Sequence, residues 1–473
     1  MIEETGWLSY FAEVIAIAVV GVGLSQNLMY FVQLALAIFA MKPERANIDD
    51  NSLWLRYSDN CPPMSMLSPA YNEEMGIVES TKALLALKYP KLEVIVINDG
   101  STDSTLECLI KAFELKPSYR IFQEVIPHKP IRGIYRSASY PNLVVVDKEN
   151  GGSKADAMNA GINVSRSPLF CAMDSDSIIE SDALLRIVQP FVDQPGRTVA
   201  VGGSVRVVNS CRVSSGRVVE VRTPKSLVAL FQVLEYMRAY AVGRVAWSEL
   251  KTLTLISGAF GVFRRDVVVN VGGYATDTVG EDLELVLKMH AYLLERKVKY
   301  NIVFLPEPLC WTEVPETLAV LKRQRTRWQM GALEVFFKHR RMFLNPRYGR
   351  IGMLGMGHIF LADVIGPLAE MLGYILIPFF WWTGVLNVEY MWALLALVFL
   401  AGTFFSMGSM LLAELDIRRY PRIKDLLRLA LAALIENLGY RQLNGLWRLR
   451  GWWKFLRKDS VWEPMPRVGF KRD

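Results

Sequence analysis

The sequence has little cysteine, and its five cysteines are widely scattered, with no C-x-x-C pair. This pattern argues against a disulfide framework and against a zinc site. We expect most of the cysteines to be small apolar side chains in a reducing compartment. No G-x-G-x-x-G follows the early predicted strands, which argues against a dinucleotide-dependent oxidoreductase. Internal repeats and low-complexity segments are also absent.

Lysine and arginine are missing between Trp7 and Met41, where Glu13 is the only acidic residue. A membrane-spanning helix needs about 20 apolar residues, so this stretch predicts one long helix or a tight, imperfect pair. It is not typical of a signal peptide, because the preceding MIEET is acidic and no small-residue cleavage site follows. Lys42 and Arg45 come directly after it, which predicts a cytoplasmic central domain.

The residues that are plentiful are unevenly distributed. The chain is 52% hydrophobic and 21% charged, with the charge mainly between about 42 and 350 and the apolar residues at both ends. Further membrane helices are predicted at about 352–384 and 390–413, and a weaker candidate at 424–441. The predicted segments are an N-terminal transmembrane segment (1–41), a cytoplasmic domain (42–315), amphipathic interface helices (316–350), transmembrane helices (351–445) and a basic aromatic C-terminal segment (446–473).

The net charge of +7 comes largely from basic residues beyond Glu414, which are interleaved with tryptophans such as Trp447 and Trp452. Such a stretch could form a nucleic-acid face. Beside apolar helices it more often marks the cytoplasmic headgroup zone of a membrane, where Lys, Arg and Trp accumulate. We therefore expect a lipid bilayer as a partner, and no nucleic acid.

The region from Met64 to about Pro315 predicts an α/β domain, because short β-rich runs alternate with helical stretches. The runs VIVIN and LVVVD are almost continuously hydrophobic, as central parallel strands are when both faces of a sheet are covered by helices. In open α/β sheets, ligands bind beyond the carboxyl ends of the strands. The polar residues that follow these strands are therefore the candidates for chemistry.

Three such polar stretches suit a nucleotide. SPAYNEE (Ser68–Glu74) and NDGSTDST (Asn98–Thr105) each end a predicted strand. Asp99 can accept hydrogen bonds from a nucleobase or ribose, although an ordinary turn with a helix N-cap explains the same pattern. KENGGSKADAMNAGI (Lys148–Ile162) places Lys154 at a helix N-terminus. That position suits a phosphate or pyrophosphate, although a flexible loop with a solvated lysine is the alternative.

Two acidic pairs suit a metal ion and a base. Asp174 and Asp176 follow an apolar strand in AMDSDSII. Hard oxygen ligands at this spacing suit Mg²⁺ or Mn²⁺ held against a diphosphate, although a lone D-x-D is common. Glu281 and Asp282 begin an amphipathic helix, where the helix dipole alone favours acids. The functional interpretation is that Asp282 acts as a general base on an acceptor hydroxyl.

A last motif, QRTRW (Gln324–Trp328), is both basic and aromatic. Arg327 can bind a diphosphate through two hydrogen bonds, and Trp328 offers a flat apolar face for a sugar ring. A helix on a membrane surface would carry similar residues. Each motif alone is weak or moderate, but D-G-S, K-A-D, D-x-D, G-E-D and Q-x-x-R-W in this order, between membrane segments, are hard to obtain by chance.

Over about residues 60–345 the chain resembles the family 2 glycosyltransferases of the GT-A fold. It resembles more closely the processive membrane synthases of cellulose, chitin, hyaluronan and poly-N-acetylglucosamine. The segments SGAFGVFRR and PEPLCWTEVPETL favour the poly-N-acetylglucosamine branch. The resemblance implies a GT-A domain with a mostly parallel central sheet, helices on both faces, and flanking transmembrane and amphipathic helices.

The resemblance also implies roles for individual residues. The residues expected to hold the donor are Tyr71, Glu73, Asp99, Lys154, Asp156, Asp174, Gln324 and Arg327. Those expected on the acceptor side are Trp328, Ser257 and Gly258. The metal ion, Mg²⁺ or Mn²⁺, would lie on Asp176 and Asp174. The catalytic pair would be Asp282, the base, and Glu281, although Gly280 replaces the threonine that usually precedes them. Trp462 and Arg467 match a gating loop over the donor, or else belong to a solvated tail.

The expected reaction is a single displacement with inversion, in which a UDP-sugar extends a β-linked polysaccharide that leaves through a membrane channel. The expected location is the inner membrane of a bacterium, with several spans, a cytoplasmic catalytic domain and accessory export proteins as further partners. One alternative is a non-processive transferase that adds one sugar to a lipid carrier. Another is a membrane transporter or receptor with a nucleotide-sensing domain, which would need no base at Asp282.

Overall fold

The computed structural model of the chain describes residues 2–40, 50–175, 177–214, 216–384, 388–416, 420 and 422–459. The chain divides into two compact units. Of the described residues, those within 50–225 and 247–314 form the sheet unit, and those within 2–40, 226–246 and 315–459 form the helical unit. Residues 226–246, which the sequence analysis assigned to the central domain, thus group with the helical unit.

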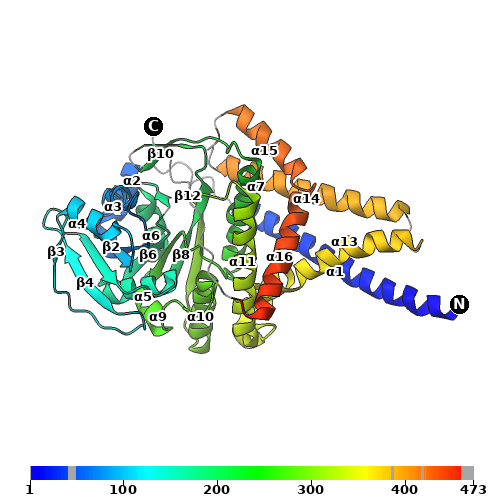
Figure 1. Ribbon diagram of the computed structural model, residues 1–473, viewed down its shortest axis with the longest axis horizontal. Coiled ribbons are helices and arrows are strands. Elements are labelled where there is room, and N and C mark those ends of the chain that lie inside the picture. The colour runs from blue at the N-terminus through cyan, green and yellow to red at the C-terminus, as the bar shows by residue number, and fades with distance from the viewer. Residues whose placement is uncertain are drawn as a thin grey trace. The chain divides into compact units, whose positions relative to one another are not determined.

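One mixed sheet forms the centre of the sheet unit. Ten strands in the described residues pair in the order β3-β4-β5-β2-β1-β6-β11-β8-β12-β7 (Figure 1). Their bounds are β1 (Met64–Ala70), β2 (Leu92–Asp99), β3 (Lys116–Pro117), β4 (Ile131–Arg136), β5 (Leu143–Lys148), β6 (Leu169–Met173), β7 (Ile178–Ile179), β8 (Thr198–Val207), β11 (Phe260–Arg264) and β12 (Asn301–Thr312). A separate hairpin consists of β9 (Arg212–Ser214) and β10 (Arg217–Glu220).

The middle of this sheet is parallel. Strands β5, β2, β1 and β6 are paired in parallel, as are β8 and β12. Every residue of β1, β5 and β6 is buried. This is the pattern expected when helices cover both faces of a sheet. The predicted α/β class with parallel strands at VIVIN and LVVVD is confirmed. The sheet as a whole is mixed rather than mostly parallel, because β3, β4, β7 and β11 pair antiparallel with their neighbours.

Helices cover the sheet. They are α2 (Asp50–Tyr57), α3 (Ile77–Leu85), α4 (Thr105–Phe113), α5 (Lys154–Val164), α6 (Ala183–Asp193), α8 (Val245–Glu249), α9 (Arg265–Asn270) and α10 (Glu281–Glu295). Helix α5 packs against β1 and β2 and is buried from Ala155 to Val164. Its Gly161 allows a close approach, since a Cβ there would lie 3.0 Å from Ile97 Cδ1. This packing fixes the N-terminus of α5 at the carboxyl edge of the sheet.

The helical unit consists of helices, of which α1, α13 and α14 are drawn as long ribbons in Figure 1. They are α1 (Ile2–Ala40), α7 (Leu227–Tyr236), α11 (Leu318–Lys338), α12 (Met356–Ile359), α13 (Gly366–Trp382), α14 (Val388–Asp416), α15 (Ile423–Ile435) and α16 (Tyr440–Arg457), with π-helical turns at Met237–Arg244, Ile351–Gly355 and Phe360–Ile365 and 3₁₀ turns at Arg340–Met342 and Pro346–Tyr348. Residues 14–40, 351–382 and 391–415 are long and apolar enough to cross a membrane. The N-terminal stretch forms one helix rather than a pair.

A buried ion cluster holds several of these helices together. The Glu436 side chain is fully buried and binds both Arg238 guanidinium nitrogens, at 2.5 and 3.2 Å, with Arg441 at 3.3 Å. The Ser406 hydroxyl donates to the same carboxylate at 2.6 Å. A buried carboxylate with these partners fixes the relative positions of the helices that carry them, because separating the partners would leave a buried charge unpaired.

In the sheet unit, His290 of α10 is an unusual buried histidine, with 1% of its surface exposed. Its Nε2 lies 2.8 Å from the Leu253 carbonyl oxygen, which can only accept, so Nε2 carries the proton. Its Nδ1 lies 2.6 Å from the Tyr300 hydroxyl, which therefore donates. Burial lowers the pKa of His290 to about 4, so the ring is neutral in the folded protein.

We predict an acid-dependent loss of stability from His290. Its pKa in the folded state is below the usual 6.5, so as the pH falls below 6.5 the unfolded chain binds the proton first. The free energy of unfolding should fall between pH 6.5 and pH 4 by up to roughly 3 kcal/mol from this group. His290→Gln should lower stability at pH 7 but show a shallower pH slope than the wild type in thermal unfolding. Equal slopes would contradict this account.

Candidate active site

The candidate site lies at the carboxyl edge of the parallel strands. Asp99 is the last residue of β2, Lys148 is the last residue of β5, and the two are directly paired in register. Tyr71 follows β1 and Asp174 follows β6. Since parallel strands end at the same edge, four strands deliver polar side chains to one place.

The loops after β1 and β2 are bonded to each other. The Asn72 backbone N–H donates to Ser101 Oγ at 3.0 Å, and the Thr102 N–H donates to Asn72 Oδ1 at 2.8 Å. Asn72 adopts a left-handed conformation, with φ of 55°, which asparagine tolerates better than most residues. The Glu73 carboxylate accepts from Ser175 Oγ at 2.9 Å, which links this loop to the one after β6. Tyr71 is 43% exposed beside these bonds.

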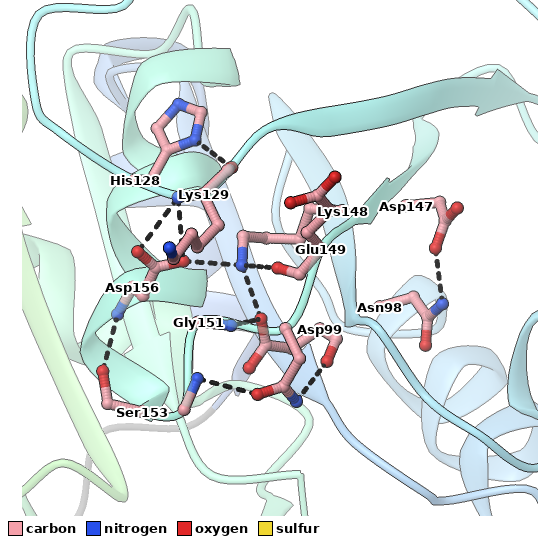
Figure 2. A network of polar contacts seen from close by, with 12 residues as sticks. Asn98, Asp99, His128, Lys129, Asp147, Lys148, Glu149, Gly151, Ser153 and Asp156 are labelled. Carbon is pink, nitrogen blue, oxygen red and sulfur yellow. Dashed lines mark hydrogen bonds and ion pairs between the residues drawn. The ribbon is translucent and has the colours of Figure 1, made fainter.

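A first network is centred on the lysine that ends β5 (Figure 2). Lys148 Nζ contacts Asp99 Oδ1 at 2.5 Å and Asp156 Oδ1 at 2.6 Å. The Gly151 N–H also donates to Asp99 Oδ1, at 3.2 Å. The backbone N–H of Lys129 donates to both carboxylate oxygens of Asp156, at 3.2 and 3.1 Å. Both acids are therefore held rigidly by charge and by backbone donors.

A second network begins at Lys154, the first residue of α5. Its ammonium forms an ion pair with Asp174 and donates to the Gly258 carbonyl at 2.9 Å. The Gly258 N–H in turn donates to Asp282 Oδ2 at 3.3 Å. The acid that follows β6, the lysine of α5, the turn before β11 and the first turn of α10 therefore converge.

The acids of this network stabilise the charge on the lysine. Burial by itself would lower the pKa of Lys154, but the negative charges of Asp174 and of residues 281–282 outweigh burial and raise the pKa above its usual value. Lys154 therefore stays positively charged at neutral pH. Asp282 is fixed as well, because the Leu283 N–H donates to its Oδ1 at 2.8 Å.

The motif QRTRW lies on α11 in the helical unit, not in the sheet unit. Trp328 is 42% exposed, and the Arg325 guanidinium lies 4.6 Å from the centre of its ring. Arg325 is also paired with Glu235 of α7. Gln324 Oε1 is buried without a hydrogen-bond partner in the described residues. Arg327, the proposed diphosphate ligand, is partly buried on the same helix.

The structure brings most of the predicted residues of the sheet unit together in the two networks. Asp99 and Asp156 share Lys148, Asp174 and Asp282 are joined through Lys154 and Gly258, and Ser257 precedes that glycine, with its Oγ accepting from the Ala259 N–H at 3.4 Å. Glu281 begins α10 beside Asp282. The second metal ligand expected, Asp176, and the gating residues Trp462 and Arg467 lie outside the described residues.

Sequence reasoning missed two residues of this region. The sequence analysis assigned Lys148 no role beyond the start of a loop. Its position directly after the hydrophobic run LVVVD is the signal that could have identified it. Tyr274 is buried, and Asn159 bonds both its backbone N–H, at 2.8 Å, and its carbonyl, at 2.9 Å. Burial, with the nearby charges of residues 281–282, raises the pKa of Tyr274 well above its usual value. No motif in the sequence pointed to it.

Comparisons with known proteins find likenesses to glycosyltransferases. Residues 131–331 match the model of "Glycosyltransferase like family 2". The poly-beta-1,6-N-acetyl-D-glucosamine synthase of Staphylococcus aureus (strain COL) is 29% identical over 293 residues, which are 60% of each chain. The Staphylococcus epidermidis synthase is 29% identical over 275 residues, 58% of this chain and 56% of the relative. The match thus spans less than two thirds of these relatives' length.

A solved structure shares the fold. The mannosyltransferase PcManGT of Pyrobaculum calidifontis, in complex with GDP-Man and Mn²⁺, superposes with a TM-score of 0.54 over 96% of this chain and 100% of its own. At 18% identity the likeness concerns the fold alone.

The geometry of the first network predicts different effects for two adjacent glycines. A Cβ at Gly151 would lie 2.3 Å from Asp156 Cγ and 2.4 Å from its Cβ, so Gly151→Ala must displace the start of α5, at a cost of about 1–3 kcal/mol. Gly152→Ala is the matched control, because a Cβ there meets nothing within 4 Å and only its φ of 72° is strained, at about 1 kcal/mol. Thermal unfolding should rank Gly151→Ala as the more damaging. Equal stability, or the reverse order, would contradict the packing described.

Proposed function

We propose that the chain transfers a sugar from a UDP-sugar to the end of a growing β-linked polysaccharide, with inversion, in the manner of a poly-N-acetylglucosamine or glucan synthase. The match of residues 131–331 to the family 2 glycosyltransferase model supports this proposal. One observation carries the proposal. Lys154, Asp174 and Asp282, far apart in the sequence, converge through Gly258 at the edge of a parallel sheet. This arrangement offers a cation for a diphosphate, an acid for a metal ion and an acid for proton removal.

In this proposal the nucleoside binds over the ends of β1 and β2, where Tyr71 is exposed and Asp99 is fixed by Lys148. Oδ1 of Asp99 takes both bonds from its neighbours, and no hydrogen bond from the described residues reaches Oδ2. That oxygen can accept from a nucleobase or ribose. Glu73 supports the same loop through Ser175.

The diphosphate is assigned to Lys154, with Gln324 and Arg327 of α11 as further ligands. A divalent ion, Mg²⁺ or Mn²⁺, would be held by Asp174 and Asp176 and would offset the charge of the departing nucleoside diphosphate. The chemistry of Asp174 fits such an ion, because its partly exposed carboxylate follows β6 and carboxylate oxygens are the hard ligands that these ions prefer. The Mn²⁺ in the similar mannosyltransferase structure supports this assignment.

The proposed chemistry follows from Asp282. Its carboxylate removes the proton of the acceptor hydroxyl, whose oxygen forms a bond to the anomeric carbon while the bond from that carbon to the diphosphate oxygen breaks. The Gly258 and Leu283 N–H groups fix the two carboxylate oxygens, so the base is oriented before the acceptor arrives. Glu281 lies next to the base and adds to the local negative charge. Trp328 and the turn at Ser257 are assigned to the acceptor.

Polymer export remains part of the proposal. Three helices in the part of the chain that the structure describes are long and apolar enough to cross a membrane, which supports a multi-pass protein. The proposed location is a bacterial inner membrane, with the catalytic domain in the cytoplasm. Of the polar residues in that region, Asp363 accepts from Arg448 of α16 at 2.9 Å and Glu370 accepts from the Tyr374 hydroxyl at 2.9 Å. Because both acids take part in hydrogen bonds within the helical unit, their presence does not by itself argue for a channel.

The proposed function is tested by supplying the purified protein with single donors and sizing the products. UDP-N-acetylglucosamine, UDP-glucose and GDP-mannose are each incubated with Mg²⁺ or Mn²⁺. We expect one UDP-sugar to give a polymer. A product with one sugar on a lipid carrier would favour the non-processive alternative. Incorporation from GDP-mannose only, or no transfer from any of these donors, would contradict the proposal.

We predict that Asp282→Asn removes transfer without removing donor binding. Loss of a general base lowers the rate by roughly 10²–10⁴-fold, whereas the affinity for UDP with Mn²⁺ should stay within about threefold of the wild type. Glu284→Gln is the control on the same helix, because Glu284 is paired with Lys288 at 3.1 Å and is assigned no chemical role. Equal loss of donor binding and transfer in Asp282→Asn would argue against the base assignment.

A further inference from the structure

Lys148 is a charged side chain with no surface exposed to solvent. Its ammonium has three N–H donors and three acceptors, which are Asp99 Oδ1 at 2.5 Å, Asp156 Oδ1 at 2.6 Å and the Glu149 carbonyl at 2.5 Å (Figure 2). Burying a lysine is costly unless every donor and the charge are satisfied. This lysine satisfies both requirements.

The two carboxylates that share Lys148 come from different elements. Asp99 ends β2, and Asp156 lies in the first turn of α5, two residues after Lys154. Both side chains are only 9% exposed. Without the lysine between them, two buried acids would face each other and repel. The ammonium group therefore joins the start of α5 to the end of β2, in addition to the packing of α5 on the sheet.

We propose that Lys148 is a positioning residue for the donor, which holds the nucleoside-binding Asp99 and the diphosphate-binding Lys154 at a fixed separation. The proposal rests on the proposed function, because it assigns those two residues to two parts of one nucleoside diphosphate. Lys148 itself is fully buried and contacts protein atoms only. Its effect reaches the ligand through Asp99 on one side and through the start of α5 on the other.

This role predicts a particular kinetic signature. The donor must span the two subsites, so a change in their separation weakens donor binding. The base Asp282 is held by the N–H groups of Gly258 and Leu283, which are distinct from the three acceptors of Lys148. We therefore expect the chemical step at saturating donor to change little. The donor KM should therefore rise in a Lys148 variant while kcat changes little.

The chain offers a matched control for the loss of a buried cation. The Arg120 side chain is 5% exposed and binds both oxygens of Glu93, at 2.6 and 3.2 Å. Glu93 lies near the beginning of β2, and Asp99 is at the end of the same strand. Arg120→Met thus removes a buried cation that pairs with the same strand, but at the end of that strand opposite the candidate site.

The experiment compares Lys148→Met and Arg120→Met with the wild type in full-length protein. We expect Lys148→Met to raise the donor KM and the Kd for UDP with Mn²⁺ by roughly tenfold or more, with kcat within about threefold. Arg120→Met should lower the unfolding temperature and leave both constants within about threefold. An unchanged KM in Lys148→Met, a fall in kcat alone, or an equal rise of KM in Arg120→Met would overturn the proposal.

A second measurement separates positioning from general damage. If Lys148 acts by holding Asp156, the effects of Lys148→Met and Asp156→Asn on donor KM are not additive. The donor KM of the double variant should then be about equal to the higher of the two single-variant values. Additive effects would overturn the proposal. Should Lys148→Met fail to fold, Lys148→Arg retains the charge, and its flat guanidinium cannot reproduce the three contacts. An unchanged donor KM in that variant would overturn the proposal as well.

The failure of this proposal is distinguishable from the failure of the proposed function. Wild-type binding of UDP and of GDP, each with Mn²⁺, is measured first. If the wild type binds neither, the proposed function fails, and the role of Lys148 fails with it. If the wild type binds UDP and Lys148→Met binds it equally well, only the role of Lys148 is overturned.

Discussion

The repulsion between acidic side chains at one edge of the parallel sheet is the constraint on which the site depends. Strand order brings Asp99 and Asp174 to the same edge, and α5 and α10 add Asp156 and Asp282. Carboxylates at close range destabilise one another unless cations or backbone donors lie between them. Two lysines supply those cations, one at the end of β5 and one at the start of α5, and backbone N–H groups supply the rest.

The two lysines differ in a way that fits two roles. Lys148 is fully buried and its donors are all used within the protein, so it fixes structure. The Lys154 side chain is 26% exposed and its partner Asp174 is 37% exposed, so both can exchange protein contacts for a ligand. A diphosphate with a divalent ion would offer each of them a new partner of opposite charge. The site thus combines a rigid part, which sets distances, with an accessible part, which meets the substrate.

Part of this could be predicted from the sequence, because part of it is local. Runs such as VIVIN and LVVVD predict buried parallel strands, and the polar residues after such strands must share an edge, so the grouping of Asp99, Lys154, Asp174 and Asp282 could be expected. The burial of Lys148 could not, because a lysine after a strand is usually solvated. The burial of Lys148 accompanies its contacts with Asp99, which is far away in the sequence, and with Asp156 at the start of α5. The grouping of residues 226–246 with the helical unit could not be predicted either, because it depends on distant contacts such as the one between Arg238 and Glu436.

The central claim is that one nucleoside diphosphate and one divalent ion bind at this edge of the sheet. A cryo-electron microscopy structure of the full chain in lipid nanodiscs, with UDP and Mn²⁺ added, tests it most directly. The account predicts the nucleoside against Asp99, the diphosphate beside Lys154 and the ion on Asp174, with Asp282 on the side open to an acceptor. UDP or Mn²⁺ bound elsewhere, with these four side chains making no contact to either, would contradict it.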